Sequence, residues 1–331
     1  MTAKRVLVTG GGGYLGSQVV ASLARLAADG GAAQAGCVVS LDVRETSAER
    51  GRPGVVYAAA DIRDPTLVDL LREHRIDTVV HLAAIVTPGR RADRDFEYQV
   101  DVEGTRNVLQ ACVAAGVQHV VISSSGASYG YHKDNPAWLT ETDAIRGNHE
   151  FAYSWHKRLV EEMLAQYRER EPQLRQTVLR IGTILGETVN NQITALFDKP
   201  RPLAIAGSDS PFVFIWDQDV VGAILHALAG GPPGIYNVAG DGALTIHQIA
   251  AHMGKRCRVL PPKLLQAALW VGKRLRLTQY GPEQLRFLQY RPVLDNRRLK
   301  EEFGYRPRKT SAEVFDFWWA ARRTAARAES S

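Results

Sequence analysis

The sequence predicts an α/β protein with a doubly wound parallel sheet and a smaller C-terminal lobe. In the first half of the chain, short β-branched runs alternate with longer helical patterns, and a glycine-rich turn follows the first run. Strands joined by helical crossovers form parallel sheets that are covered on both faces. The 331 residues, 45% hydrophobic and 23% charged, are enough for about two globular domains.

The expected strands are short and apolar. They are RVLVTG (5–10), CVVSLD (37–42), GVVYAAAD (54–61), DTVVHLAA (77–84), HVVISSS (119–125), QTVLRIG (176–182) and GIYNVAG (234–240). Helical periodicity covers 14–28, 65–74, 96–115, 151–170 and about 219–229, and a surface loop is expected at 28–36. We expect residues 1–181 and about 215–240 to form the sheet domain, 182–214 and 241–320 a substrate-binding lobe, and 321–331 a frayed tail.

Charge and cysteine content narrow the class of protein. The net charge is +6, but residues 255–331 hold 18 Lys/Arg against 7 Asp/Glu, which makes this part +11 and the remainder −5. A solvated helical face is the ordinary reason for such an excess, and no basic stripe interleaved with aromatic residues indicates nucleic-acid binding. Cys37, Cys112 and Cys257 are scattered, so we expect no disulfide framework, no metal site and a reducing cytoplasm. The apolar runs are too short for a signal peptide or an integral membrane segment.

The segment VLVTGGGGYLGSQVV (6–20) is typical of a Rossmann-type nucleotide site. Thr9, Gly10, Gly13 and Gly16 lie between a strand and a helix, where glycines permit close approach of a pyrophosphate to the helix N-terminus. A plain turn is the alternative. Asp42 ends the second strand, where a carboxylate accepts hydrogen bonds from ribose hydroxyls, and this favours NAD over NADP, although Arg44 weakens the preference.

The pattern Tyr-x-x-x-Lys occurs at Tyr129–Lys133 and again at Tyr153–Lys157, while a third copy, Tyr305–Lys309, contains a proline and is expected in a short turn. A tyrosine and a lysine four residues apart become neighbours only on a helix. Gly130 follows Tyr129 at once, which is loop chemistry. Tyr153, by contrast, opens a run without Gly or Pro up to Glu171. The second copy is therefore the candidate.

A tyrosine with a pKa near ~10 is a poor base at neutral pH, but a nearby ammonium ion and a nicotinamide ring lower the pKa of the phenol. Lys157 would also orient the nicotinamide ribose. One hydroxyl of the run Ser123-Ser124-Ser125, at the end of the fifth strand, would hold the substrate oxygen while Tyr153 moves its proton. Packing tyrosines and loop-capping serines are the alternative explanation for each feature alone.

The chain also resembles the extended short-chain dehydrogenase/reductases, or NAD-dependent epimerase/dehydratases, and among them a divergent member of the UDP-glucose 4-epimerase type. The resemblance runs from Arg5 to about Trp319 through TGGGGYLG, AADIRD, VVHLAA, DVEGTRNVLQAC, ISSSGASYG and YSWHK. It implies a catalytic set of Ser125, Tyr153 and Lys157 with Asn107 in support. It also implies that Asp61 and Ile62 contact the adenine, that Tyr14, Leu15, Leu82, Ala83 and Ala84 contact the cofactor, and that two copies pair through helices 96–115 and 151–170.

The substrate is open at this stage. Nucleotide-sugar epimerases of this family have an R-D-Y-I-H-V-like segment whose arginine binds a phosphate, and the equivalent stretch here, SPFVFIWDQD (210–219), has none. Arg291, Arg297 or Arg298 could substitute. We therefore prefer an NAD(P)-dependent oxidoreductase acting on a small-molecule secondary alcohol or ketone. A nucleotide-sugar epimerase or dehydratase with tightly bound NAD is the alternative, and a binding protein without turnover is the weakest one.

One helical pattern has no assigned role. PPKLLQAALWVGKRLRL (261–277) places apolar residues at helical spacing between basic ones. We expect ordinary core packing, as for most such stripes. Lining an apolar pocket or lying on a membrane surface are the alternatives.

Overall fold

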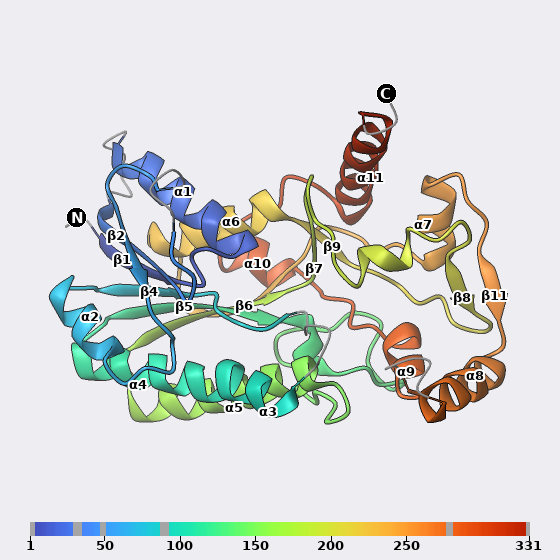
Figure 1. Cartoon of the computed structure of the whole chain (residues 1–331), viewed down its shortest axis with the longest axis horizontal. Helices are drawn as coiled ribbons and strands as arrows, with labels where there is room; N and C mark the ends of the chain where they lie inside the picture. The colour runs from blue at the N-terminus through green and yellow to red at the C-terminus, as the bar shows by residue number, and fades with distance from the viewer. Residues whose placement is uncertain (1–3, 29–34, 47–50, 87–92, 276–280, 329–331) are drawn as a thin grey trace.

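The computed structural model describes residues 4–28, 35–46, 51–86, 93–275 and 281–328. A sheet of seven parallel strands, in the order β10-β6-β5-β4-β1-β2-β3, forms the larger part (Figure 1). The strands are β1 (Lys4–Thr9), β2 (Ala35–Asp42), β3 (Val55–Ala59), β4 (Thr78–His81), β5 (His119–Ser125), β6 (Arg175–Ile181) and β10 (Gly234–Val238). The predicted fold class is confirmed. The expected loop at 28–36 lies mostly outside the described residues, and β2 begins at its end.

Helices cover both faces of this sheet (Figure 1). On one face lie α1 (Tyr14–Ala28), α6 (Asp217–Leu228) and α10 (Arg297–Glu301); on the other lie α2 (Leu67–Glu73), α3 (Arg94–Tyr98), α4 (Thr105–Ala115) and α5 (Ala152–Arg170). Successive side chains of β1 point to opposite faces of the sheet, as in any strand. Val6 and Val8 join the core under α1 and α6, whereas Leu7 joins the core under α4 and α5.

The helix expected over 96–115 is interrupted. A π-helical segment, η2 (Gln99–Gly104), separates α3 from α4. Thr105 Oγ1, at the start of α4, donates to the carbonyl of Asp101 in this segment at 2.6 Å. A Cβ on Gly104 would lie 2.6 Å from Ile62 Cδ1, so the glycine allows the segment to approach the loop after β3.

The lobe stands at the carboxyl edge of the sheet (Figure 1). Its strands are β7 (Thr183–Leu185) with β9 (Phe214–Trp216) and β8 (Leu203–Ile205) with β11 (Arg258–Leu260). Its helices are η4 (Thr194–Leu196), α7 (Ile246–His252), α8 (Pro262–Arg274), α9 (Gln284–Gln289) and α11 (Ser311–Ala328). A short helix outside the lobe, η3 (Gly126–Tyr129), directly follows β5. Its core is aromatic and includes Phe197, Phe212, Phe214, Phe315 and Trp318.

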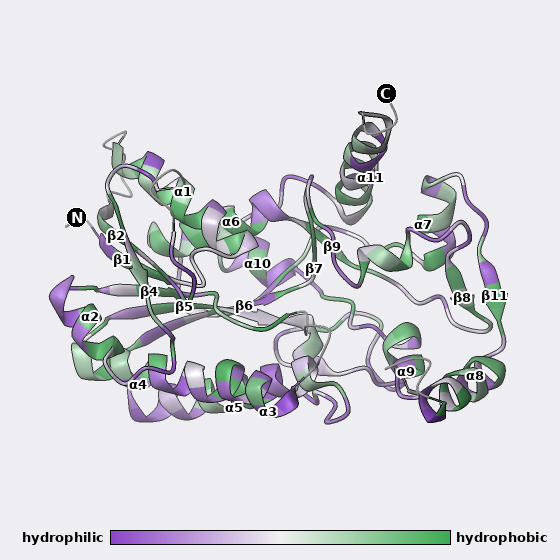
Figure 2. Ribbon diagram, viewed as in Figure 1, coloured by the Kyte–Doolittle hydropathy of each residue, from purple (hydrophilic) through white to green (hydrophobic). Residues whose placement is uncertain are grey.

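Two expectations are corrected in the C-terminal part. The tail expected to fray from residue 321 continues α11 as far as Ala328, because alanine and arginine favour helix and Arg322 is anchored to Asp198 at 2.8 Å. Residues 329–331 lie outside the described part. Core packing of the 261–277 pattern is also wrong, since no side chain of α8 is buried. Figure 2 shows apolar residues on this outer helix. Of the helices that the structure describes, none combines the length and the hydropathy needed to cross a bilayer.

A buried ion pair joins α5 to the sheet. Arg180 of β6 and Glu161 of α5 are 5% and 3% exposed, with Nη2 and Oε2 2.6 Å apart. Arg180 Nε donates to both oxygens of Glu161, and Ser124 Oγ donates to Oε1. Burial by itself would lower the pKa of Arg180, but the hydrogen bonds and charge of Glu161 outweigh it and raise that pKa. The pair sets where α5 lies along β5 and β6.

Two buried histidines occupy strand positions. His81 Nε2 lies 3.0 Å from Thr105 Oγ1, and His119 Nε2 lies 2.9 Å from Thr177 Oγ1. Burial, with the charge of Lys157 second, lowers the pKa of His81 to about 3. Burial, with Lys4 and Arg175 contributing, lowers the pKa of His119 to about 4. Both side chains are therefore neutral in the folded protein at neutral pH.

Replacing Glu161 by Leu should strongly destabilise the fold, because Arg180 is then buried without its partner. We expect a loss of about 3–5 kcal/mol in the free energy of unfolding, measured by urea denaturation. Glu162→Leu is the matched control: Glu162 is 42% exposed and pairs with Arg158 on the surface. It should change stability by less than about 1 kcal/mol. Equal effects of the two substitutions would contradict the structural role of the buried pair.

Acid should destabilise the fold below about pH 6.5, where free histidine gains its proton. At such pH values His81 and His119 are protonated in the unfolded chain but stay neutral in the folded protein. The free energy of unfolding therefore falls as the pH falls toward their folded pKa values. We expect each histidine to contribute about 1 kcal/mol of loss between pH 7 and 5.5. His119→Gln should reduce the loss measured by urea denaturation, whereas His247→Gln, at an exposed position, should leave it unchanged. An unchanged loss in His119→Gln would be the contrary result.

Candidate active site

A tight glycine turn joins β1 to α1. Gly10 has a φ of 67°, and a Cβ there would lie 2.9 Å from the backbone of Ala83. Gly13 N donates to the Gly10 carbonyl at 2.9 Å, and a Cβ on Gly16 would collide with that same carbonyl. The first turn of α1 carries no acidic residue. The turn therefore forms a cradle that only glycines permit, at a helix N-terminus suited to a phosphate.

The carboxyl ends of β1 and β4 meet beside this turn. Thr9 Oγ1 lies 2.7 Å from His81 Nδ1 and accepts the amides of Leu82 at 3.2 Å and Ala83 at 3.3 Å. The fold thus brings together the expected cofactor residues of the glycine turn and of segment 82–84. His81 holds the two strand ends together through its ring.

Tyr14 and Leu15 open α1 and point in different directions. The Tyr14 hydroxyl donates to Asp217 Oδ2 at 2.5 Å, so this residue joins the glycine turn to the start of α6. Leu15 packs, partly buried, against the core between α1 and α6. Of the two, only Tyr14, which is 41% exposed, has a large accessible surface.

Asp42 lies beside the glycine turn at the end of β2. Its Oδ2 accepts the Gly12 amide at 3.1 Å, and its Oδ1 accepts the Arg44 amide at 3.1 Å. Arg44 Nε also lies 3.2 Å from Oδ1, although its side chain is largely exposed. A nucleotide whose phosphates occupy the glycine turn would therefore present its adenosine ribose to Asp42.

Asn107 does not lie with the catalytic candidates. Its Nδ2 donates to the carbonyls of Ile62 at 2.7 Å and Asp64 at 2.8 Å, so it ties α4 to the loop after β3. In that loop Asp61 pairs with Arg63 at 2.6 Å, and Ile62 is buried. The structure therefore brings Asn107 to the expected adenine side instead of the catalytic edge.

The three serines at the end of β5 have different environments, because side chains alternate along the strand. Ser124 points into the buried network and donates to Glu161. Ser123 donates to the His81 carbonyl at 3.4 Å. Ser125 is the last strand residue, and its Oγ accepts the Ala127 amide at 3.2 Å as the N-cap of η3. Of the three, Ser125 lies at the very edge of the sheet.

Tyr153 and Lys157 lie in the first two turns of α5. Lys157 is 7% exposed, and its Nζ donates to the Ser123 carbonyl at 2.8 Å. The same Nζ lies 5.6 Å from the centre of the Tyr153 ring. Ser154 Oγ donates to the Ala127 carbonyl at 2.7 Å, which holds the start of α5 against η3. The fold thus places Ser125, Tyr153 and Lys157 at one edge.

Tyr129 belongs to the buried network. It is fully buried. Its hydroxyl accepts a hydrogen bond from Arg180 Nη1 at 2.8 Å and donates one to Asn237 Oδ1 at 2.8 Å. Burial raises the pKa of this phenol. Residues 130–133 form no helix, so Lys133 does not lie one helical turn from Tyr129. The prediction that only the second Tyr-x-x-x-Lys copy lies on a helix is confirmed.

Sequence reasoning missed a buried pair between η2 and α5, the helix that carries Tyr153 and Lys157. Asp101, in the π-helical segment, accepts the Ile85 amide through Oδ1 at 2.8 Å, and its Oδ2 lies 3.1 Å from His156 Nδ1. Both side chains are buried. His156 directly precedes Lys157, so the pair fixes the register of α5 against η2. The signal was present, since Asp101 lies six residues before Asn107 in the motif DVEGTRN, but it does not identify a partner 55 residues away.

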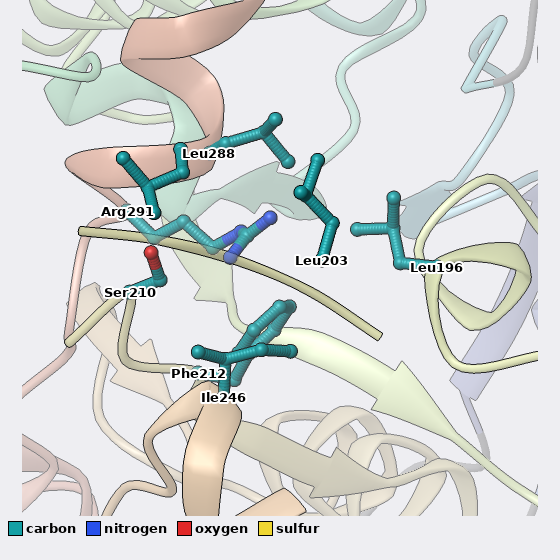
Figure 3. Close-up of a pocket in the computed structure, with 8 residues that line it drawn as sticks. Leu196, Leu203, Ser210, Phe212, Ile246, Leu288 and Arg291 are labelled. Carbon is teal, nitrogen blue, oxygen red and sulfur yellow. The ribbon is translucent and has the colours of Figure 1, made fainter. Parts of the chain in front are cut away.

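Arg291 lies in the lobe (Figure 3). It stacks its guanidinium 3.7 Å from the centre of the Phe212 ring, and its Nε and Nη2 are buried without a hydrogen-bond partner among the described residues. Burial lowers the pKa of Arg291 to about 9, so it is still charged at neutral pH. The adjoining cavity of about 20 Å³ is lined mainly by apolar side chains, among them Leu196, Leu203 and Leu288. The other two arginines expected as substitutes are paired at the surface, Arg297 with Asp295 and Arg298 with Glu302.

Aromatic rings connect this arginine to the catalytic edge. Phe287 lies under Arg291 at 4.9 Å, and Tyr131 meets the rings of both Phe287 and Phe151 at 5.1 Å. Phe151 is the N-cap residue of α5, two positions before Tyr153. The lobe and the start of the catalytic helix therefore share one apolar wall.

Comparison with known proteins gives a consistent result. The sequence model of the NAD dependent epimerase/dehydratase family matches residues 6–239. An uncharacterised protein of Mycobacterium tuberculosis is 27% identical over 96% of this chain and 84% of its own length. The dTDP-D-glucose 4,6-dehydratase of Mus musculus is 30% identical over 76% of this chain and 72% of its own length.

Solved structures share the fold over nearly the whole chain. A UDP-glucose 4-epimerase of Thermotoga maritima, solved with UDP-glucose, superposes with a TM-score of 0.73 at 20% identity, covering 97% of this chain and 99% of its own. The NAD complex of a Thermus thermophilus UDP-glucose 4-epimerase superposes with a TM-score of 0.70 at 26% identity and the same coverage. Since the family match spans more than half of the chain, the protein belongs to the NAD dependent epimerase/dehydratase family.

Proposed function

We propose that the protein is an NAD-dependent oxidoreductase that transfers hydride at a secondary alcohol or ketone carbon. The observation that carries this proposal is the buried Lys157 ammonium, held by the Ser123 carbonyl beside the Tyr153 ring at the carboxyl edge of the sheet. The glycine turn and Asp42 lie at that same edge and suit a dinucleotide. When bound there, NAD supplies the hydride acceptor or donor.

The residues of the chain divide the remaining work. Ser125 holds the substrate oxygen through its hydroxyl. Tyr153 takes the proton of a substrate alcohol or returns it to a ketone, and the positive charge of Lys157 favours the phenolate form that this transfer requires. The Asp101–His156 pair and the Ser154 hydrogen bond keep these groups in register, because they hold the first turns of α5 against η2 and η3.

A second candidate, a nucleotide-sugar epimerase or dehydratase, is favoured by Arg291. A buried guanidinium without a carboxylate is costly unless an anion joins it. It stacks on Phe212, within the stretch that lacks the arginine of the family's R-D-Y-I-H-V-like segment. A substrate phosphate would satisfy Nε and Nη2, although the cavity of about 20 Å³ must widen to admit it. Several relatives and solved neighbours are named as UDP-glucose epimerases or dTDP-glucose dehydratases.

Substitution of Tyr153 tests the shared chemistry. Tyr153→Phe should lower turnover about 10²- to 10⁴-fold while NAD still binds, because only the proton-transfer group is removed. Turnover is followed by NADH absorbance with a panel of hydroxy compounds, and by product analysis with UDP- and dTDP-sugars. Tyr167→Phe, on the same helix, is the control and should retain full activity. Wild-type turnover in Tyr153→Phe would refute the proposed role.

Substitution of Arg291 separates the two candidates. If a diphosphate binds there, UDP or dTDP should raise the melting temperature of the wild type. Arg291→Met should weaken that binding about 10- to 100-fold. The melting temperature of the free variant should stay equal or rise, because an unpaired buried charge is removed. Arg297→Met, at a 70% exposed position, should behave as wild type.

No shift of the wild type with either nucleotide would eliminate the nucleotide-sugar candidate and leave the oxidoreductase proposal standing. An undiminished shift in Arg291→Met would show that Arg291 does not bind the diphosphate.

A further inference from the structure

Helix α8 lies at the outer end of the lobe (Figure 1), and several of its apolar side chains are exposed to solvent. Leu264, Trp270, Val271 and Leu275 are 58%, 58%, 46% and 62% exposed. The aromatic core of the lobe is complete without them. Within the described residues, these four side chains therefore stay exposed to solvent.

The exposed residues form an ordered stripe. Leu264, Ala268, Val271 and Leu275 follow one another at spacings of four, three and four residues, which places them along one line of a helix. Leu265, Leu269 and Gly272 are half-buried on the side toward the lobe. The stripe borders these half-buried residues around the helix, so it extends the apolar face of α8 into solvent.

Positive charge surrounds the stripe. Residues 242–282 contain seven Lys/Arg and no Asp or Glu. On α8, Lys263 and Arg274 are exposed on the side that carries Trp270, and Arg256 and Arg258 are exposed on the neighbouring segment around β11. Val259, the residue directly after Arg258, is 51% exposed. Lys273 is paired with Glu283 and contributes less free charge.

We propose that α8 is an interfacial helix that attaches the protein to the surface of an anionic lipid bilayer. A helix that lies in the membrane plane buries aliphatic side chains at the boundary of headgroups and acyl chains, keeps Trp at the interface, and sets Lys and Arg against anionic headgroups. The α8 surface offers all three. The attachment is peripheral, since no helix in the described residues is suited to span the bilayer.

The dimensions of the surface favour a bilayer over a protein partner. A helix of 13 residues is about 20 Å long. One stripe of four exposed side chains falls short of the roughly 800 Å² that each partner buries in a stable protein–protein complex. The basic residues of 242–282, which have no acidic residue among them, also repel a second copy of the same surface.

Co-sedimentation of the full-length protein with lipid vesicles tests the proposal. The wild type should bind vesicles of phosphatidylglycerol mixed with phosphatidylcholine and should bind pure phosphatidylcholine far more weakly, with binding reduced by salt. Leu264→Glu combined with Val271→Glu should reduce binding more than about tenfold. Lys263→Glu combined with Arg274→Glu should reduce it about fivefold or more for each charge.

Two control variants carry substitutions of the same type at exposed positions away from α8. Val56→Glu changes a 40% exposed valine of β3, and Arg72→Glu changes an exposed arginine of α2; both should bind vesicles as the wild type does. Melting temperatures should be unchanged in the α8 variants, because their side chains are exposed. Failure of the wild type to bind anionic vesicles overturns the proposal. So does equal binding by the α8 variants, or loss of self-association in sedimentation velocity in Leu264→Glu, which would assign the stripe to a second copy.

Discussion

The buried pair of Arg180 and Glu161 is the interaction on which the rest of the structure depends. Arg180 occupies β6 and Glu161 occupies α5, so the pair fixes the helix along the sheet. The same guanidinium donates to the Tyr129 hydroxyl and to the Glu141 carbonyl. Asn237 continues the network by donating to the carbonyls of Leu139 and Asp295. One charge pair therefore joins two strands, α5 and the segment that leads into the lobe, and loss of one of its partners would be costly because it leaves a buried charge unsatisfied.

A second network, of hydrogen bonds, holds the start of α5. Thr9, His81 and Thr105 form a chain of hydrogen bonds across the ends of β1, β4 and α4. Thr105 in turn donates to the carbonyl of Asp101, whose carboxylate meets His156 on α5. The π-helical segment turns Asp101 toward α5. Together the two networks hold Tyr153 and Lys157 with little freedom at the edge where the glycine turn lies, as the proposed proton transfer by Tyr153 would require.

The lobe adds two further features, Arg291 and α8, to those of the sheet domain. Arg291 brings one unpaired positive charge into an otherwise apolar region and shares an aromatic wall with the start of α5. The charge therefore lies where it can select an anionic substrate group without touching the reacting atoms. Farther out, α8 turns both apolar and basic side chains to the solvent. We thus propose that the lobe governs substrate choice and attachment to a membrane, and that the sheet domain carries the hydride and proton transfer.

The sequence by itself determined the order of elements and the local chemistry of the site. Glycines at 10, 13 and 16, the carboxylate at the end of β2 and the Tyr153–Lys157 spacing are short-range features, and hydrophobic periodicity shows which strand or helix carries each one. Only the tertiary structure decided what depends on distant partners. It placed Asn107 against the loop after β3, joined Asp101 to His156, paired Arg297 and Arg298 with carboxylates while leaving two nitrogens of Arg291 unsatisfied, and left α8 unburied. Periodicity reveals that a helix has an apolar face, but whether that face is covered depends on residues far along the chain, and no local pattern encodes their position.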